Sequence, residues 1–431
     1  MVDAATGWLD PFVPPTGDAA WTDLPLVTDI FPWQQPGCKF GRTWPIGPSP
    51  DLLERRWERL AAASTVEKRE LFFTAKTGRN IDTSVDPLRR LSDARVSTPH
   101  EPIMRYGYRS FDVQWAFHDP RMAARESPSL WQSLSNRQIF FSSLLTGQIG
   151  QGPALTLSVY VPDLHFFRGN FGGKDIISLY RDAAAREPNV TMGLPRVLAD
   201  RLGIDAPTPE DIAAYVYALL SASAYQARFA DELRTPGLRV PITADAALWE
   251  ETLAVGRELI WLHSYGERFR DQNAGRGGQV PFVDGIGWTE PVSAMPSGTS
   301  AIRYDEQTQT LVIGDGQVSG VRPDVWAYSV TGMPVVAKWL GYRTARPTGR
   351  AASSTSALDQ MRPAVWPDEW NDELLDLLRV LTITLDRQQM LADLLTRICE
   401  APLILGSELP IPGVAERRLP ATLRAPTFDF G

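Results

Sequence analysis

The sequence contains few cysteines, histidines and lysines. Cys38 and Cys399 are the only cysteines in 431 residues, so we expect neither a disulfide framework nor a cysteine-rich zinc site. The four histidines form no pair at a spacing typical of metal ligands. We therefore expect no metal and no other cofactor. Two distant cysteines without partners are typical of a reducing compartment, which predicts a cytoplasmic protein.

Long apolar runs are absent as well. No stretch approaches the roughly 20 residues that a membrane-spanning helix needs. The first residues, MVDAATGWLDPFVPP, lack the basic and apolar segments of a secretory signal. The sequence therefore predicts no membrane partner.

Motifs of a self-contained catalytic site are also missing. The sequence has neither a GxSxG nucleophile motif nor a GxxxxGK[ST] phosphate loop. The Gly-rich stretches 171–175 and 313–320 lack the strand–GxGxxG–helix context, so we interpret them as turns. A Pro-Asp pair at 162–163 followed by Lys174 is similar to a nuclease site, but Gly172 stands where an acid belongs. We expect a binding module and not an enzyme, with a stand-alone nuclease as the least favoured alternative.

Acidic residues outnumber basic residues. The chain has 43 Lys and Arg against 51 Asp and Glu, a net charge of −8. This balance disfavours a general nucleic-acid coat, because non-specific DNA binding depends on summed positive charge. A localised basic surface is still compatible with it. Only five of the basic residues are lysine, and arginine has the planar fork that suits phosphate and guanine.

Hydrophobic patterning predicts an α+β protein in four parts. We expect an N-terminal arm and helix for partner docking in 1–95 and a strand-rich mixed unit in 96–205. A helical unit with a small β meander follows in 206–350, and a C-terminal helical pair and tail in 351–431.

Local signals place the main elements. Thr208 and Asp211 have the spacing of a capping box, and an apolar stripe of Ile212, Tyr215, Val216, Leu219 and Leu220 follows. Further helices are predicted at 51–62, 248–269, 333–343, 370–389 and 390–403. Strands are predicted at 138–145, 154–161 and 325–332, a meander at 301–321, and a polar linker at 346–356.

Residues 104–117, MRYGYRSFDVQWAF, combine arginines with aromatic rings. As one strand, this stretch would place Arg105, Gly107, Arg109, Phe111 and Val113 on one face, and Tyr106, Tyr108, Ser110, Asp112 and Gln114 on the other. One arginine-bearing face and one aromatic face fit a half-buried strand beside a DNA groove. A buried pair of Asp112 with Arg109 or Arg121 is the alternative interpretation.

Several ordered blocks along the chain carry a family resemblance. RSFDVQWAF at 109–117 is similar to an R-(P)-F-D-x-R-x-x-Y element. AAYVYALLSASAYQARFADEL at 213–233 and VWAYSVTGMPVVAKWLGYRTARP at 325–347 match two further blocks. On these blocks the chain resembles the C-terminal target-recognition region of type ISP restriction–modification enzymes. Ser110, Gln114, Gln226 and Met333 depart from the family pattern.

The resemblance implies a sequence-specific DNA-binding specificity subunit of a restriction–modification or related phage-defence system. This chain would be a separate polypeptide. Its partners would be double-stranded DNA and a DNA adenine methyltransferase, and nuclease or translocase subunits are further candidates. The candidate DNA-binding residues, none of them catalytic, are Arg105, Arg109, Gln114, Arg121, Asn136, Arg137, Arg168, Asn170, Lys174, Lys338, Arg343 and Arg346. The alternative is a non-catalytic scaffold or interaction protein of a defence complex, without DNA readout.

Two segments supply the last six of these candidates. The loop HFFRGNFGGKD sets cations and an asparagine between aromatic rings and glycines. The run from Lys338 to Arg350 has no acid between Asp324 and Asp359, so it concentrates positive charge locally. Phosphate contact is the favoured interpretation, and a solvated linker is the alternative.

Overall fold

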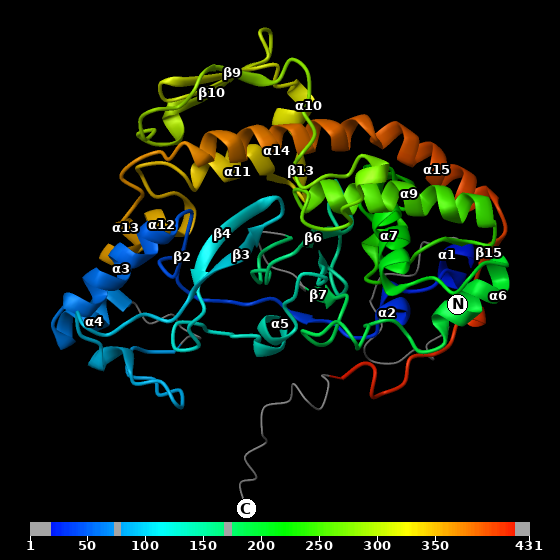
Figure 1. Ribbon diagram of the computed structural model, residues 1–431, viewed down its shortest axis with the longest axis horizontal. Coiled ribbons are helices and arrows are strands. Elements are labelled where there is room, and N and C mark those ends of the chain that lie inside the picture. The colour runs from blue at the N-terminus through cyan, green and yellow to red at the C-terminus, as the bar shows by residue number, and fades with distance from the viewer. Residues whose placement is uncertain (1–18, 73–78, 168–174, 419–431) are drawn as a thin grey trace, which may run out of the picture.

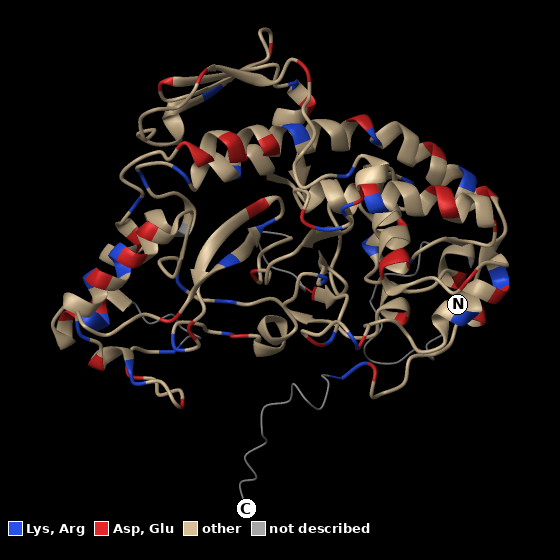
Figure 2. Ribbon diagram, in the orientation of Figure 1, with Lys and Arg blue, Asp and Glu red and all other residues tan. Residues whose placement is uncertain are grey.

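The protein combines helices with several small antiparallel sheets. A computed structural model describes residues 19–72, 79–167 and 175–418. The elements confirm the expected α+β class. Charged residues of both signs alternate along the outer helices, whereas the inner strands are mostly uncharged (Figure 2).

A long helical arc covers one side of the molecule. It consists of α14 (Glu369–Asp386) and α15 (Gln388–Glu400), which confirm the predicted C-terminal helical pair (Figure 1). Helices α3 (Pro50–Ala62) and α4 (Thr65–Phe72) lie near one end of the arc, and α7 (Pro209–Leu220) and α9 (Ala246–His263) lie toward the other.

The remaining helical segments are short. The α-helices are α1 (Ala19–Asp23), α2 (Val27–Ile30), α5 (Pro128–Gln132), α6 (Leu194–Leu202), α8 (Ser223–Arg228), α10 (Pro323–Trp326), α11 (Val335–Gly341), α12 (Gly349–Ala352) and α13 (Ala357–Gln360). The 3₁₀ turns are η1 (Leu91–Asp93), η2 (Glu232–Arg234), η3 (Gln272–Ala274), η4 (Thr299–Ala301) and η5 (Gly406–Glu408).

The strands form antiparallel sheets of two to four strands. One sheet has the order β2 (Ile46–Gly47), β4 (Asp112–Phe117), β3 (Ile103–Arg109). A second has the order β1 (Gln35–Pro36), β7 (Asp175–Ser178), β5 (Phe140–Ser143), β6 (Thr156–Ser158). The predicted meander is the sheet β10 (Ile302–Asp305), β11 (Thr310–Ile313), β12 (Gly316–Ser319), β9 (Gly287–Glu290). Two small pairs are β13 (Ser329–Val330) with β14 (Met333–Pro334), and β15 (Leu403–Ile404) with β8 (Ile242–Thr243).

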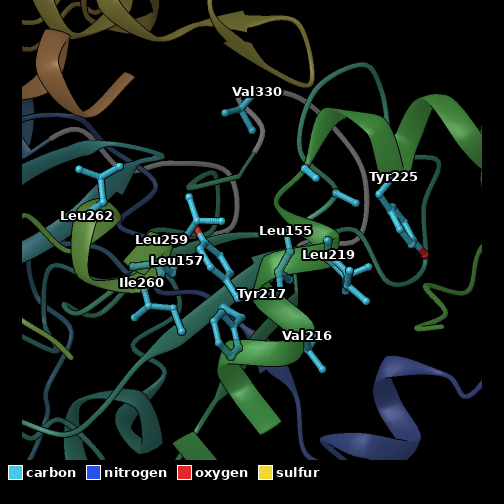
Figure 3. Packing of buried hydrophobic residues seen from close by; sticks show 14 of the residues in the cluster. Leu155, Leu157, Val216, Tyr217, Leu219, Tyr225, Leu259, Ile260, Leu262 and Val330 are labelled. Atoms are coloured by element: carbon cyan, nitrogen blue, oxygen red, sulfur yellow. The ribbon is translucent and has the colours of Figure 1, made fainter. Parts of the chain in front are cut away.

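Helix α7 is the centre of the larger hydrophobic core. Its capping box is confirmed, since the Thr208 hydroxyl accepts from the Asp211 amide at 3.1 Å and the Asp211 carboxylate accepts from the Thr208 amide at 3.0 Å. The predicted apolar stripe is buried. Helix α9 approaches α7 closely at Gly256, where a side chain would not fit. A Cβ at this position would lie 2.0 Å from the Ala214 carbonyl oxygen. Figure 3 shows the side chains of α7 and α9 meeting those of β6.

Two clusters of buried apolar residues organise the described chain. The larger one joins residues of α7, α9, α14 and α15 to the sheet of β5, β6 and β7. The smaller one gathers residues of α3, α4 and the β3–β4 hairpin, and includes Leu358 from far along the chain. The four predicted parts of the chain stay a prediction.

Three sequence expectations are wrong in detail. Residues 104–117 form a hairpin and not one strand, because the chain turns at Ser110–Phe111, where Phe111 has a left-handed φ of 64°. The helix expected at 248–269 ends at His263, since Tyr265 and Gly266 also have positive φ. The strand expected at 325–332 is reduced to β13, because Pro323 begins the short helix α10.

Candidate nucleic-acid interface

The β3–β4 hairpin is held firmly at the middle of the molecule. Arg105 pairs with Trp115 and Tyr106 with Gln114 across the hairpin, and β4 also pairs with β2. Gly107 allows a close approach to β6, because a Cβ at this position would lie 2.5 Å from the Ser158 hydroxyl oxygen. The hairpin therefore presents its side chains from a fixed backbone.

A cleft of about 710 Å³ opens beside this hairpin. Its lining comes from segment 39–48, Arg56 of α3, the hairpin, Asp163 and His165, α11 with its flanks, α12 and Arg362. Six of the lining residues are cationic: Lys39, Arg42, Arg56, Arg109, Lys338 and Arg362. Among the described residues, Asp163 is the sole acidic residue of the lining. The cleft thus concentrates positive charge in a chain whose net charge is −8.

Arg109 is fixed in the wall of the cleft. Its Nη1 lies 2.9 Å from the Asp163 carboxylate, and its guanidinium lies 3.9 Å from the centre of the Tyr108 ring. Tyr106 donates its hydroxyl to the other oxygen of Asp163 at 2.9 Å. The one acid of the lining is therefore already engaged by Arg109 and Tyr106. The side chain of Arg109 is 13% exposed, which leaves part of it facing the cleft.

In the described part of the chain, Arg56 and Arg362 are bound by backbone carbonyl oxygens and not by carboxylates. Arg56 is buried and donates to the carbonyl oxygens of Trp44, Ile46 and Met361, each at 2.8 Å. Arg362 donates to the carbonyl oxygens of Thr344 and Tyr342. Among the described residues, neither arginine has a carboxylate within salt-bridge distance. Burial, reinforced by the nearby Arg362 charge, lowers the pKa of Arg56 to about 9.

Two lysines complete the positive surface. Lys338 is exposed on α11, and Lys39 is half-buried beside Phe40. Within the described parts of the chain, no carboxylate forms an ion pair with either lysine. Their ammonium groups are therefore available to an anion that approaches the cleft.

Of the twelve residues predicted from the sequence, Arg109, Gln114 and Lys338 line the cleft. Gln114 is buried, and its amide donates to the Asp112 carboxylate at 2.9 Å. Arg346 is exposed next to the C-terminal end of α11. Arg168, Asn170 and Lys174 lie outside the described residues.

The expected surface position is wrong for Arg121 and Arg343. Arg343 is fully buried, 3.0 Å from the Asp112 carboxylate and 3.7 Å from the centre of the Trp339 ring. Arg121 is buried with its Nη2 2.7 Å from the Asp119 carboxylate. Burying a guanidinium requires a carboxylate or comparable acceptors, and both residues have one. We therefore leave both out of the proposed interface.

Arg105, Asn136 and Arg137 lie outside the cleft lining. Arg105 is half-buried over the Trp115 ring and lies 3.8 Å from the Glu373 carboxylate. Asn136 and Arg137 are exposed, and the Arg137 guanidinium lies 2.6 Å from the Glu210 carboxylate. The structure therefore does not bring these three together with Arg109.

Sequence reasoning missed Lys39, Arg42, Arg56 and Arg362. One signal was present, because Arg56 falls three and four residues from Leu53, Leu52 and Leu60 on the apolar face of the helix at 51–62. An arginine on the buried face of a helix needs acceptors inside the protein. No such signal marks Lys39 or Arg362.

The described residues contain no cluster of His, Cys, Asp and Glu that would hold a metal ion. No helix among them is both long enough and apolar enough to cross a bilayer.

A family model described as the Type ISP C-terminal specificity domain matches residues 29–377, most of the 431-residue chain. The chain belongs to this family. The resemblance of the hairpin and helix blocks is therefore confirmed. No curated protein sequence matches this specificity domain.

Solved structures with the same fold include three that contain DNA. A DrdV–DNA complex matches with a TM-score of 0.56 and 18% identity, over 89% of this chain and 38% of that chain. A nuclease-deletion mutant of the Type ISP enzyme LlaGI with a DNA substrate mimic matches with a TM-score of 0.53 and 17% identity, over 87% of this chain and 29% of that chain. The ATP-dependent Type ISP enzyme LlaBIII bound to DNA matches with a TM-score of 0.56 and 15% identity, over 88% of this chain and 25% of that chain. This specificity domain thus spans less than half the length of each relative, and at these identities the likeness shows the fold.

Proposed function

We propose that this specificity domain binds double-stranded DNA at a defined sequence within a restriction–modification or related phage-defence system. It would present the target duplex to a partner adenine methyltransferase, which acts on a base turned out of the helix. The chain itself would catalyse no step. Methylation, cleavage and translocation would come from partner domains or subunits, in the cytoplasm. Family membership and the DNA in the three related structures support this proposal.

The single observation that carries the proposal is the charge of the cleft. Six cations and one engaged acid line it, in a chain that is acidic as a whole. Localised positive charge attracts phosphate and steers a polyanion to one place on the surface. Lys39, Lys338 and Arg346 would contact phosphates and position the duplex, whereas residues of the hairpin would lie nearer the bases.

Binding to randomised DNA tests the proposal directly. We expect the chain, alone or with its methyltransferase, to enrich a defined sequence from a duplex library. In direct binding assays the affinity falls as salt rises, because counterions are released at each neutralised phosphate. The slope of log K against log salt is negative, and the double variant Lys39→Ala/Lys338→Ala should make it less steep by about 1.8, because two phosphate contacts are lost. Arg196→Ala is the matched control, because its side chain is 88% exposed on α6, which contributes nothing to the cleft.

Absence of enrichment and of any duplex binding, even beside the methyltransferase, would refute DNA recognition. A scaffold without DNA readout is the second candidate, and two observations favour it. Gln114 is buried against Asp112, and Arg343 lies in the interior. A chain that assembles with the methyltransferase, while the complex ignores every duplex, would establish that alternative.

A further inference from the structure

The size of the cleft limits what can enter it. A volume of about 710 Å³ is in the range of pockets that hold one small ligand, roughly 300–1,000 Å³. The major groove of DNA alone is about 12 Å wide, so a duplex rests on the rim of such a cleft and does not fill it. The interior fits a single nucleotide.

At the inner wall of the cleft, Arg56 and Arg362 form no salt bridge with a carboxylate of the described residues, although the Asp359 carboxylate is near enough to raise the pKa of Arg56. After burial, the Arg362 charge is the next cause that lowers the pKa of Arg56, and the Arg343 charge lowers the pKa of Arg362. Tyr108 has an opposite effect on the pKa of both arginines, smaller than that of burial. Burial is the larger effect and lowers the pKa of both. The Nε of Arg56 is buried and has no hydrogen-bond partner among the described residues. A phosphate in the cleft would offset this repulsion.

An aromatic and arginine surface lies beside these cations. The rings of Tyr108 and Tyr342 meet edge to face with centroids 4.9 Å apart, and the Arg109 guanidinium covers the Tyr108 ring. All three residues line the cleft. Bases stack on aromatic rings and arginine planes, and arginine also donates hydrogen bonds to base edges. This surface therefore complements the part of a nucleotide that a phosphate site leaves unbound.

We propose that the cleft binds one nucleotide turned out of a DNA duplex, with its phosphate near Arg56, Arg362 and Lys338 and its base beside Tyr108 and Arg109. The duplex as the source of this nucleotide rests on the proposed function. A free nucleoside monophosphate has the same chemistry, so the experiment includes both sources.

The test compares a duplex that carries one unpaired nucleotide with the fully paired duplex of the same sequence. Turning a base out of a paired helix costs free energy, and an unpaired base avoids most of that cost. We expect the full chain to bind the bulged duplex about tenfold more tightly, as fluorescence anisotropy measures. In parallel calorimetric titrations, deoxynucleoside monophosphates should bind about tenfold more tightly than inorganic phosphate.

Variants of the inner wall give the second readout. Arg362→Met keeps an unbranched apolar stem and removes the charge, and should bring the ratio of bulged to paired affinity toward one. Circular dichroism checks its folding, and the exposed Lys338→Glu serves the same purpose if Arg362→Met does not fold. Arg196→Ala is the control and should keep the wild-type ratio.

The two proposals fail separately. Equal binding of bulged and paired duplexes, together with nucleotides that bind no better than phosphate, would overturn the nucleotide site and leave duplex recognition standing. Nucleotide binding without any duplex binding, even beside the methyltransferase, would support the site with a free nucleotide as ligand and would refute the proposed function.

Discussion

The buried ion pair of Arg343 and Asp112 gives the most quantitative prediction. It joins the β3–β4 hairpin to the chain just after α11, over 231 positions of sequence. Arg343 is 0% exposed and Asp112 is 3% exposed. The Asp112 carboxylate also accepts from Gln114, so the pair orients a residue of the cleft.

Removal of either partner should destabilise the protein markedly. Breaking a buried ion pair costs roughly 3–5 kcal/mol, because the remaining charge stays in the interior. Asp112→Asn leaves Arg343 with Glu373 at 3.6 Å and the Trp339 ring at 3.7 Å, which offset part of the loss. We therefore expect Asp112→Asn to lower the free energy of unfolding by about 3 kcal/mol, and Arg343→Met to lower it by a similar amount.

The double variant separates this pair from general damage. Asp112→Asn/Arg343→Met removes both charges, so its cost should stay near 3 kcal/mol and not reach the sum of about 6 kcal/mol. The coupling free energy is then about 3 kcal/mol. Urea unfolding followed by tryptophan fluorescence and circular dichroism measures all three variants, with coincident transitions as the criterion for a free energy.

An exposed pair is the matched control. Arg196 and Asp200 lie 3.9 Å apart with side chains 88% and 74% exposed, so the same substitutions there should change stability by less than about 0.5 kcal/mol. Costs below about 1 kcal/mol for the single variants of the buried pair, or additive costs in the double variant, would refute the reasoning.

Three further predictions follow from other residues. Burial lowers the pKa of His263 to about 3, so stability should fall as pH drops from about 6.5 toward 3, by roughly 2 kcal/mol at pH 5. The reason is that His263 binds a proton more readily in the unfolded chain than in the folded one. Urea titrations at several pH values measure this pH dependence of stability, which His263→Phe should remove. Thr208→Ala removes the capping box of α7 and should cost about 1 kcal/mol, measured by thermal unfolding against an exposed Thr355→Ala. Arg109→Lys keeps the charge but loses the planar fork, so the enriched DNA sequence should relax at one position while binding to random duplex is retained; an unchanged sequence would contradict this.

Much of the fold was predictable from local patterns. The capping box, the stripe of α7 and the two C-terminal helices depend on residues within a few positions of each other, and the structure confirms them. The hairpin turn was missed because Phe111 adopts a left-handed conformation, and no glycine or asparagine at this position indicates such a turn. An aromatic residue at such a position is maintained by its surroundings, here by Tyr265, which donates its hydroxyl to the Phe111 carbonyl.

The sequence by itself determined the fold class and the family, because periodicity and ordered motifs are properties of the linear chain. Tertiary structure alone decided which cations lie in the cleft and which are buried. Arg56 bonds to Met361 across 305 positions, and Arg343 to Asp112 across 231. Electrostatic interactions depend on distance and burial in space, and neither quantity is fixed until distant segments pack together.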